Sequence, residues 1–464
     1  MKKILIFIIM ISGLSSCLVG PKYKSPALPN YKAYGDSTAT VGSAARKDSV
    51  TLIKWTEVYK DPQLTKLIQT VLSNNLDLLT AISRVEEARA TYGISSAGVY
   101  PSFNYNVKGG VNDLGDNAQR SGVGINKQVY SGLATMNWEI DLFGKLRHQK
   151  RSDWALFIAQ QNNAQALRVS LIAEAAALYF TLRDQDHRLE IANKTVLMRT
   201  ESLKLISERF SKGYVSELDK LQSQQQLALA QAIIPNAQQQ IIATQNSLRV
   251  LTGQAPGVIQ RGNSIYDQQL PPEIPAGIPS DLLQRRPDII AAEQTLISQT
   301  EAIGVATAMR FPSLSLTGIF GVASPDLSTI VNPESFALGM SGNLLGPIFE
   351  FGKNARRVEA QRARTDQYNY QYQLTLLNAF AEVDNSLAAL RLNNQEHDAY
   401  KTALDAASKA YYLTEKRYFD GYSNYLELLN QQDNLFNAEL SESATQTQQN
   451  IAVVNLFKAL GGGW

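Results

Sequence analysis

The chain has 464 residues, 44 basic and 42 acidic side chains, and a formal net charge of +2. This length is typical of roughly two to four domains, and a charge so close to zero, without a dominant basic patch, argues against nucleic acid as a partner. The three histidines, His148, His187 and His397, are far apart in sequence. We expect them to be ordinary exposed side chains, and we predict no metal site and no cofactor.

The N-terminus has the pattern of an export signal. Lys2-Lys3 precede the apolar run Ile4 to Ile11, and Leu14-Ser15-Ser16-Cys17 follow it. This predicts a signal peptide over residues 1–16, too short to span a bilayer as a helix. The last four of these residues resemble a bacterial lipoprotein cleavage box, which makes Cys17 the lipidated first residue of the mature chain. An ordinary signal peptide that contains a cysteine is the alternative. By analogy with lipoprotein sorting, Leu18 in place of an aspartate favours the outer membrane.

Residues 17–60 predict an extended, lipidated tether, because Pro21, Pro26 and Pro29 exclude regular helix. A helix is expected after Asp61-Pro62, where aspartate is a good N-cap. No later apolar run reaches the roughly 18 residues that a membrane-spanning helix needs. A chain of this kind crosses a membrane only with strands.

Two pairs of strands are expected, at about 101–113 and 128–142 and at about 312–323 and 335–351. In the first strand Phe103, Tyr105 and Val107 alternate with polar residues, the two-residue period of a strand. Each strand is long enough to cross a bilayer when tilted. Aromatic residues at the strand ends fit an interfacial girdle: Tyr100, Phe103, Phe143, Phe311, Phe349 and Phe351. A soluble β-meander is the alternative.

Helix is expected over 77–99 and, in longer pieces, over 144–213, 215–253, 352–421 and 423–460. The last of these has a period of about 3.5 residues, typical of coiled coils. Its seam is weak, since Ala, Gln, Asn and Ser fill much of both faces. Such residues favour helices packed around a wet lumen over an ordinary soluble coiled coil, the alternative.

The sequence is duplicated. Asp77 matches Asp288 at an offset of 211 residues, and Arg209-Phe210-x-x-Gly213-Tyr214 matches Arg417-Tyr418-x-x-Gly421-Tyr422 at an offset of 208. We therefore predict a first repeat over 61–253, a linker over 254–279 and a second repeat over 280–464. Each repeat holds a helix, two strands and a long helix hairpin, with hairpin tips at Gly213 and Gly421.

Several landmarks, taken together and in order, closely resemble the trimeric outer-membrane efflux channels of the TolC and OprM type, lipoprotein branch. They are Cys17-Leu-Val-Gly20-Pro21-x-Tyr23, Tyr100-Pro101-Ser102, Asp141-Leu-Phe-Gly144-Lys145, Leu282-Leu-x-Arg285-Arg286-Pro287-Asp288 and Arg417-Tyr418-x-x-Gly421. The resemblance implies a mixed fold, in which four strands from each of three protomers close a transmembrane β-barrel of twelve. A long α-helical barrel continues it into the periplasm, and the mature chain is anchored in the outer membrane by its lipid.

The same resemblance implies a passive conduit and no enzyme activity. A homotrimer in outer-membrane lipid would bind a periplasmic adaptor and an inner-membrane pump, which we expect to be proton-driven, and would release small molecules such as drugs, toxic compounds or metal ions. Type I protein secretion uses the same family and is the main alternative. A stand-alone porin is a further alternative, although it would not need two long hairpins.

The resemblance also implies where the contacts lie. The adaptor would touch the hairpin tips: Lys212, Gly213, Tyr214, Val215, Ser216, Asp420, Gly421, Tyr422 and Ser423. The periplasmic gate candidates are Tyr418, Asp420, Tyr422, Ser423 and Glu427. Family members often carry an acidic residue at the position of Ser423, and this chain does not. A ring of Asp420 or Glu427 favours cations, although solvated surface carboxylates are the commoner case.

Two expectations come from the residues themselves. Ser216 and Ser423 are suited to cap the helices that follow the tips. Arg285-Arg286-Pro287-Asp288 opens a helix, and we expect it to form a structural pair between arginine and carboxylate.

Overall fold

The computed structural model describes residues 18–26, 60–111, 128–268 and 285–462. Cys17, the signal peptide, most of the tether and residues 269–279 of the linker lie outside the described residues. The helices and strands are α3 (Pro62–Asn74), α4 (Leu76–Ala97), β1 (Ser102–Val111), β2 (Gln128–Ile140), α6 (Lys145–Ser211), α7 (Glu217–Leu251), η1 (Ile265–Asp267), α9 (Pro287–Ala308), β3 (Ser313–Ser324), η2 (Leu327–Thr329), η3 (Pro333–Ser335), β4 (Phe336–Leu345), α10 (Lys353–Phe419) and α11 (Tyr425–Ala459).

The chain divides into two compact units, and each unit takes segments from both sequence repeats. The first, here named the strand unit, comprises residues 1–28, 84–161 and 291–373; the second, the hairpin unit, comprises 29–83, 162–290 and 374–464. The two repeats are thus copies in sequence rather than the compact units of the fold. The physical reason is that α6 and α10 are single long helices that contribute residues to both units.

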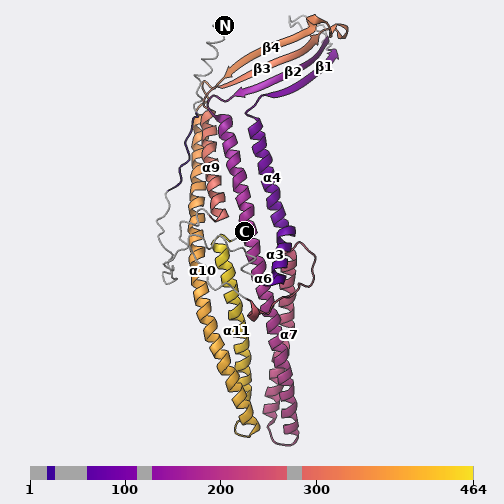
Figure 1. Cartoon of the computed structure of the whole chain (residues 1–464), viewed down its shortest axis with the longest axis vertical. Coiled ribbons are helices and arrows are strands. Elements are labelled where there is room, and N and C mark those ends of the chain that lie inside the picture. The colour runs from indigo at the N-terminus through magenta and orange to yellow at the C-terminus, as the bar shows by residue number, and fades with distance from the viewer. Residues whose placement is uncertain (1–17, 27–59, 112–127, 269–284, 463–464) are drawn as a thin grey trace. The chain divides into compact units, whose positions relative to one another are not determined.

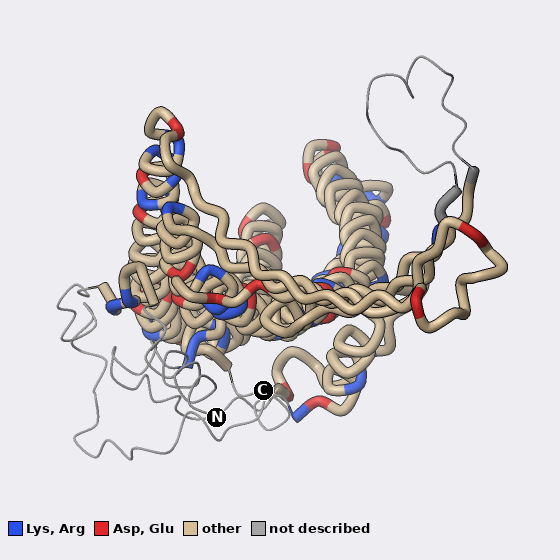
Figure 2. The backbone as a smooth tube through the Cα atoms, turned by 90° about the horizontal axis from the view of Figure 1, so that it is seen from above, with Lys and Arg blue, Asp and Glu red and all other residues tan. Residues whose placement is uncertain are grey.

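In the strand unit, β1 to β4 form one antiparallel sheet in sequence order (Figure 1). The register pairs Tyr105 with Ala134, and Ala134 in turn with Phe320. Lys108 and Glu139 are the only charged residues on the described strands, and the strands in Figure 2 are accordingly almost uncoloured. On both edge strands large apolar side chains are exposed: Phe103, Tyr105, Val107, Leu338, Met340 and Leu344. Such a surface is typical of a sheet that contacts lipid or further protein.

The expected end of the fourth strand, at residue 351, is wrong. Strand β4 ends at Leu345, because Gly346-Pro347 follows and proline has no N–H to donate to a ladder. Gly346 also lies so close to Pro312 that a Cβ on it would be 2.9 Å from the proline ring. The other strands begin and end within two residues of the expected positions, where those positions are described.

The core of the hairpin unit joins α3, α6, α7 and α11. Its buried large side chains include Leu64, Ile68, Tyr179, Phe180, Leu248, Val454 and Phe457. Small residues such as Ala175 and Ala176 lie fully buried among them and allow the helices to approach closely. Along α11 the expected period holds for Leu429, Phe436 and Val454, which are buried, whereas Leu426 is exposed.

Arg286 forms the expected pair with carboxylates. It donates to both oxygens of Asp288, to Glu382 at 2.7 Å and to the carbonyl oxygen of Ala459 at 3.0 Å. Burial alone would lower the pKa of Arg286, but the two carboxylates raise it overall, so the guanidinium stays charged. This arginine ties the start of α9 to α10 and to the end of α11.

The expectation that all three histidines are exposed is wrong for two of them. His148 is 2% exposed and His397 is 8% exposed, and each ring is hydrogen-bonded to a neighbour. Within the described ranges, no group of histidine, cysteine and carboxylate side chains is arranged to hold a metal ion. None of the helices described here combines enough length with enough hydrophobicity to cross a bilayer.

Asp61 begins α3 and organises its surroundings. One carboxylate oxygen accepts from the backbone N–H of Gln63 and Leu64, as an N-cap does. The other accepts from the Tyr179 hydroxyl and the Asn263 N–H, each at 2.9 Å, and from Gln268 at 3.2 Å. Burial alone would raise the pKa of Asp61, but these donors together lower it.

Replacing Asp61 by asparagine tests this network. The new NH2 group faces N–H or O–H donors, so we expect the free energy of unfolding to fall by about 2–4 kcal/mol at neutral pH. Because the folded-state pKa is depressed, the wild-type advantage is present above the unfolded pKa and is lost as pH falls through the folded one. Denaturation midpoints of both proteins in detergent, measured against pH, should therefore converge in acid. Asp267→Asn, an exposed change in the same segment, is the control and should leave the midpoint unchanged.

Candidate functional site at the two hairpin turns

The first hairpin turn joins α6 to α7. Gly213 has a φ of +77°, the left-handed conformation that closes a helix, and Tyr214 N–H donates back to the Arg209 carbonyl oxygen at 2.9 Å. Ser216 then caps α7 through a reciprocal capping box with Asp219. The local sequence therefore explains this turn: Gly213 ends α6, and the hydrogen-bonded pair of Ser216 and Asp219 starts α7.

The second turn, between α10 and α11, repeats this geometry with different residues. Gly421 has a φ of +81°, and Tyr422 N–H donates to the Arg417 carbonyl oxygen at 2.8 Å. The expected cap at Ser423 is wrong. Asn424 is the N-cap and accepts from the Glu427 N–H at 2.8 Å, while the Ser423 hydroxyl donates to the Glu427 carboxylate at 2.7 Å. The offset of 208 residues pairs Ser216 with Asn424, so the duplication itself contained the correct cap.

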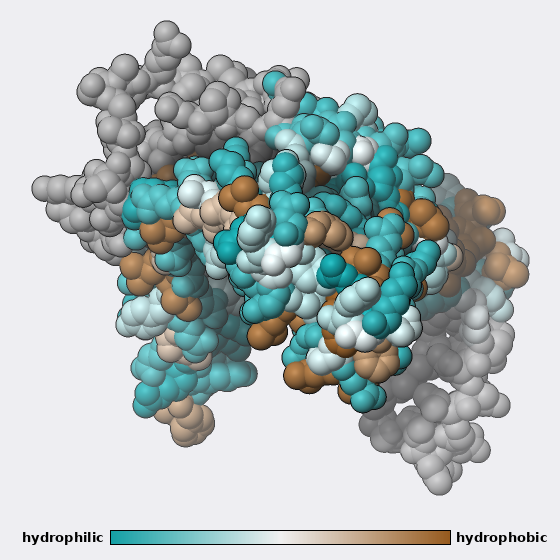
Figure 3. Space-filling model, turned by 90° about the horizontal axis from the view of Figure 1, so that it is seen from below, coloured by the Kyte–Doolittle hydropathy of each residue, from teal (hydrophilic) through white to brown (hydrophobic). Residues whose placement is uncertain are grey.

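Most of the expected tip residues are exposed at these turns. Lys212 and Asp420, which hold matching positions before the two glycines, are both exposed, and so are Tyr214 (76%) and Tyr422 (77%). Both turns lie at the same end of the hairpin unit in Figure 1, and Figure 3, viewed from that end, shows brown hydrophobic groups scattered among teal ones. Val215 differs, because it is half-buried against the cluster described next.

A small hydrophobic cluster joins the two hairpins behind the turns. Its buried members are Ile206, Tyr418, Tyr425, Leu428 and Leu429. The Arg209 guanidinium donates to the Tyr418 hydroxyl at 2.8 Å and lies 5.2 Å from the centre of the Tyr418 ring. A hollow of about 590 Å³ opens beside this pair, lined by residues of both turns.

The gate candidates thus fall into two groups. Tyr418 is buried and bonds to the first hairpin. The other four lie at the second turn, where Asp420 and Tyr422 are exposed and the Ser423 hydroxyl donates to the Glu427 carboxylate. Sequence reasoning missed Arg209 as the partner of Tyr418. A signal was present, since Arg209 and Arg417 occupy matching positions of the repeat, but nothing in the pattern shows which arginine crosses between the hairpins.

Further polar contacts tie the same two hairpins together. On α6, Arg199 binds Asp433 of α11 and the Gln226 carbonyl oxygen of α7, and Lys194 pairs with Glu439 at 3.1 Å. Burial lowers the pKa of Arg199 and raises that of Asp433, and the opposite charge of each partner counteracts that shift.

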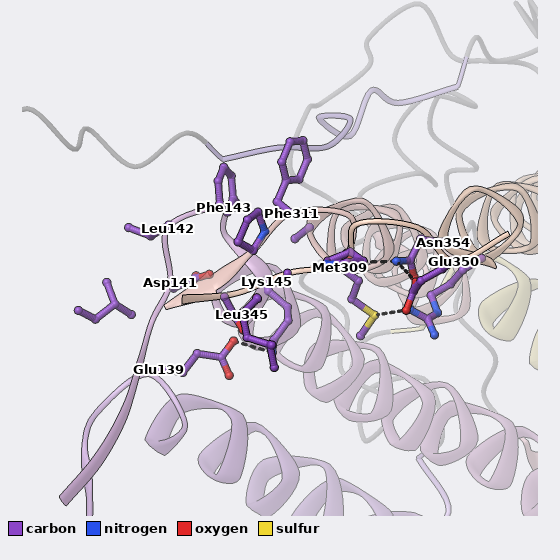
Figure 4. A pocket seen from close by; sticks show the side chains of 17 residues that line it. Glu139, Asp141, Leu142, Phe143, Lys145, Met309, Phe311, Leu345, Glu350 and Asn354 are labelled. Carbon is purple, nitrogen blue, oxygen red and sulfur yellow. Dashed lines mark hydrogen bonds and ion pairs between the residues drawn. The ribbon is translucent and has the colours of Figure 1, made fainter. Parts of the chain in front are cut away.

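The strand unit carries a second hollow, of about 410 Å³, where strands meet helix ends (Figure 4). Phe143 and Phe311 stack there with ring centres 4.7 Å apart. Lys145 pairs with Glu139 at 2.6 Å, and Asp141 accepts from Arg147 at 3.0 Å. Its charged groups are hydrogen-bonded or paired with neighbouring side chains, which fits a structural junction.

Comparison with known proteins decides the family. The family model described as "Outer membrane efflux protein" matches residues 67–254 and 278–462. The chain belongs to the outer membrane efflux protein family. The resemblance to outer-membrane efflux channels that the sequence landmarks indicated is thereby confirmed, and the family is one of transport conduits rather than of enzymes.

Individual outer membrane efflux proteins match along nearly the whole chain. The solvent efflux pump outer membrane protein SrpC of Pseudomonas putida is 32% identical over 453 residues, covering 97% of this chain and 96% of that protein. Outer membrane protein OprJ of Pseudomonas aeruginosa is 32% identical, covering 97% and 94%.

Solved structures of this family agree with the fold. The CmeC outer membrane channel of Campylobacter jejuni has a TM-score of 0.87 at 25% identity and covers 97% of this chain and 95% of that chain. The open state of the MtrE outer membrane channel of Neisseria gonorrhoeae has a TM-score of 0.87 at 27% identity, covering 96% and 98%. The expected fold class is confirmed: this chain has the protomer fold of a TolC-like outer-membrane channel.

The duplicated turns allow a matched test of capping. Ser216→Ala and Asn424→Ala each remove a side-chain acceptor from a helix start, so each should cost about 1 kcal/mol of local stability. Ser423→Ala leaves the α11 cap intact and should not loosen the helix start. Hydrogen exchange of the first turns of α7 and α11 reports the difference. Faster exchange in Ser423→Ala than in Asn424→Ala would contradict the assignment.

Proposed function

We propose that this protein is the outer-membrane exit channel of a tripartite efflux system and that it conducts small molecules passively. The observation that carries this proposal is the whole-length match to efflux pump outer membrane proteins, together with two exposed hairpin turns on the same chain. The channel breaks no bonds, so none of its residues acts as a nucleophile or as a general acid. An inner-membrane pump, which we take to be proton-driven, supplies the energy, and a periplasmic adaptor connects the two.

The proposed assembly is a homotrimer. Within the described part of the chain, strands β1 and β4 each pair on one side only, so their free backbone groups need further strands before the sheet can face lipid. Three copies close a barrel of twelve strands, and their helices continue it as an α-helical barrel in the periplasm. Acyl chains on Cys17 add the lipid anchor.

The cargo follows from the pump rather than from this chain. The relatives are named for solvents, toluene and antibiotics, which favours small apolar compounds here. Type I protein secretion remains the alternative, with the same channel and a different pump. A stand-alone porin gives no role to exposed turns at the far end of two long hairpins.

The adaptor contact is tested by photo-crosslinking in cells. Tyr214 is the better position for the crosslinking phenylalanine derivative, because it is exposed and aromatic, whereas Val215 is half-buried. We expect Tyr214 to capture a periplasmic adaptor, with a proton-driven or an ATP-driven pump co-purifying; the second would indicate protein secretion. Tyr370, exposed on α10 and remote from both turns in sequence, is the control. If Tyr214 captures no more than Tyr370 does, the tripartite proposal fails.

The gate is tested by removing a single hydrogen bond. We propose that Tyr418, held by Arg209, keeps the two hairpins together in the closed channel. Tyr418→Phe retains the ring and loses the bond to a charged donor, so the closed state should weaken by about 1.5–3 kcal/mol, or roughly tenfold or more in open probability. Conductance of the purified channel in planar bilayers measures this. Tyr412→Phe, at an exposed position of the same helix, should behave as wild type, and equal conductance in all three proteins would refute the gate.

A further inference from the structure

The hollow of about 410 Å³ in the strand unit is lined by one cation that has no opposite charge beside it, Arg357 of α10. Its guanidinium donates through Nη1 to Asn354 Oδ1 at 2.7 Å and to the Met309 sulfur at 3.3 Å. Within the described residues no carboxylate pairs with it, and its Nε–H and Nη2–H donors have no partner. Because a guanidinium presents five N–H donors in a planar fork, most of this fork is open to a ligand.

The remaining charges around the hollow balance one another. Lys145 pairs with Glu139 on one side of the view in Figure 4, and Glu350 accepts from Asn354 on the other. If the arginine that binds Asp141 is counted with the lining, three cations face three carboxylates: Lys145, Arg147, Arg357, Glu139, Asp141 and Glu350. A lining with both signs and no net charge is complementary to a zwitterion rather than to a simple anion. The volume is within the roughly 300–1,000 Å³ of small-molecule sites.

The segment after β4 gives the hollow an apolar flank. Pro347 and Glu350 line the hollow, whereas Ile348, Phe349 and Phe351 of the same segment are exposed, Ile348 fully so. The neighbouring edge strand β4 exposes further large apolar side chains. A continuous apolar surface of this kind indicates contact with lipid or with another molecule.

The turn that separates the two sets of side chains is strained. Phe351 has a φ of +50°, the only positive value at a non-glycine position among the described residues. For an L-residue this conformation costs about 1–2 kcal/mol, and such strain is concentrated at ligand sites, where the surroundings maintain it. Here the turn keeps Glu350 on the hollow, while the rings of Phe349 and Phe351, with centres 4.5 Å apart, remain exposed.

We propose that this hollow binds the headgroup of a phospholipid that carries a primary ammonium, a phosphoethanolamine headgroup. The phosphate accepts from the open donors of Arg357, because guanidinium and phosphate match as parallel N–H···O bonds. The ammonium donates to the Glu350 carboxylate, and the acyl chains lie along Ile348 and Phe349. The proposal rests on the proposed function, since it needs the sheet to lie in the outer membrane.

A second copy of the chain is the other candidate occupant, and its charges do not fit. In the proposed trimer, β4 meets the β1 edge of a neighbouring copy. Residues 88–111, which comprise β1 and the chain before it, contain no aspartate or glutamate. This edge therefore offers Arg357 no carboxylate, whereas a phospholipid supplies both the anion and the apolar chains.

The test is native mass spectrometry of the purified, delipidated full-length protein, titrated separately with dioleoyl phosphatidylethanolamine, phosphatidylcholine and phosphatidylglycerol. We expect phosphatidylethanolamine to bind most tightly. Arg357→Gln removes the charged donors to the phosphate and should weaken this binding about tenfold. Arg356→Gln is the matched control and should bind as wild type does, because this neighbouring arginine is outside the lining and pairs with Glu359 at 2.7 Å.

Glu350→Gln tests the ammonium separately. Phosphatidylcholine has a quaternary ammonium without an N–H, so it cannot donate to a carboxylate. We therefore expect Glu350→Gln to remove the preference for phosphatidylethanolamine over phosphatidylcholine and to leave phosphatidylcholine binding unchanged. Glu359→Gln, an exposed carboxylate outside the hollow, should keep the wild-type preference.

Equal affinities of Arg357→Gln and Arg356→Gln for phosphatidylethanolamine overturn the site, and tighter binding of phosphatidylglycerol overturns the zwitterion. Displacement of the lipid by an equal concentration of glycerophosphoethanolamine, which has no acyl chains, also overturns the proposal in favour of a soluble ligand. Fractionation of the same cells separates this from the proposed function. A protein absent from the outer membrane contradicts the channel itself, whereas an inserted protein with equal variants contradicts only the lipid site.

Discussion

Unpaired strand edges are the constraint on which this structure depends. Among the described residues the sheet ends on one side at β1 and on the other at β4, and each edge leaves a row of backbone N–H and C=O groups without a ladder partner there. Hydrocarbon offers no substitute partner, so a four-stranded sheet with apolar faces is incomplete in a bilayer. The need for neighbouring copies, and so the trimer that we propose, comes from this shortage of strands rather than from any single contact.

The duplication supplies two hairpins, and sequence differences between the two copies place basic side chains on one hairpin opposite acceptors on the other. Three basic side chains of the first hairpin, Lys194, Arg199 and Arg209, make these contacts. Their partners on the second hairpin are Glu439, Asp433 and Tyr418, respectively. At the offset of 208 residues, Lys194 and Arg199 correspond to Thr402 and Ala407. One copy has thus kept or gained the positive charges that the other lacks.

Much of the fold could be predicted from the sequence, because the spacing of apolar residues and the positions of glycine and proline depend only on nearby residues. Long helices, the turn glycines Gly213 and Gly421, and the strand alternation around Tyr105 all follow from short windows and from the repeat. The end of β4 was missed because the apolar residues up to Phe351 continue past Gly346-Pro347, where proline ends the ladder. The cap at Asn424 was missed because serine is the more familiar cap one position earlier.

The candidate site was less predictable than the fold, because its contacts join distant segments. Arg209 and Tyr418 are 209 residues apart, and His148 and Glu301 are 153 apart. No periodicity shows which arginine crosses between hairpins or which carboxylate lies beside a buried histidine. The two compact units were hidden for the same reason, since each is assembled from segments of both repeats.

The two turns are near copies in backbone but opposite in charge at the residue before the glycine, lysine at 212 and aspartate at 420. In a three-fold ring of such hairpins, the ends would alternate in sign around the rim. A charged group on a rigid partner would then be attracted at one turn and repelled at the next. Six mechanically similar contacts would thereby be grouped into three equivalent pairs of opposite charge, so that a three-fold partner would find its favourable register only once in every third of a turn.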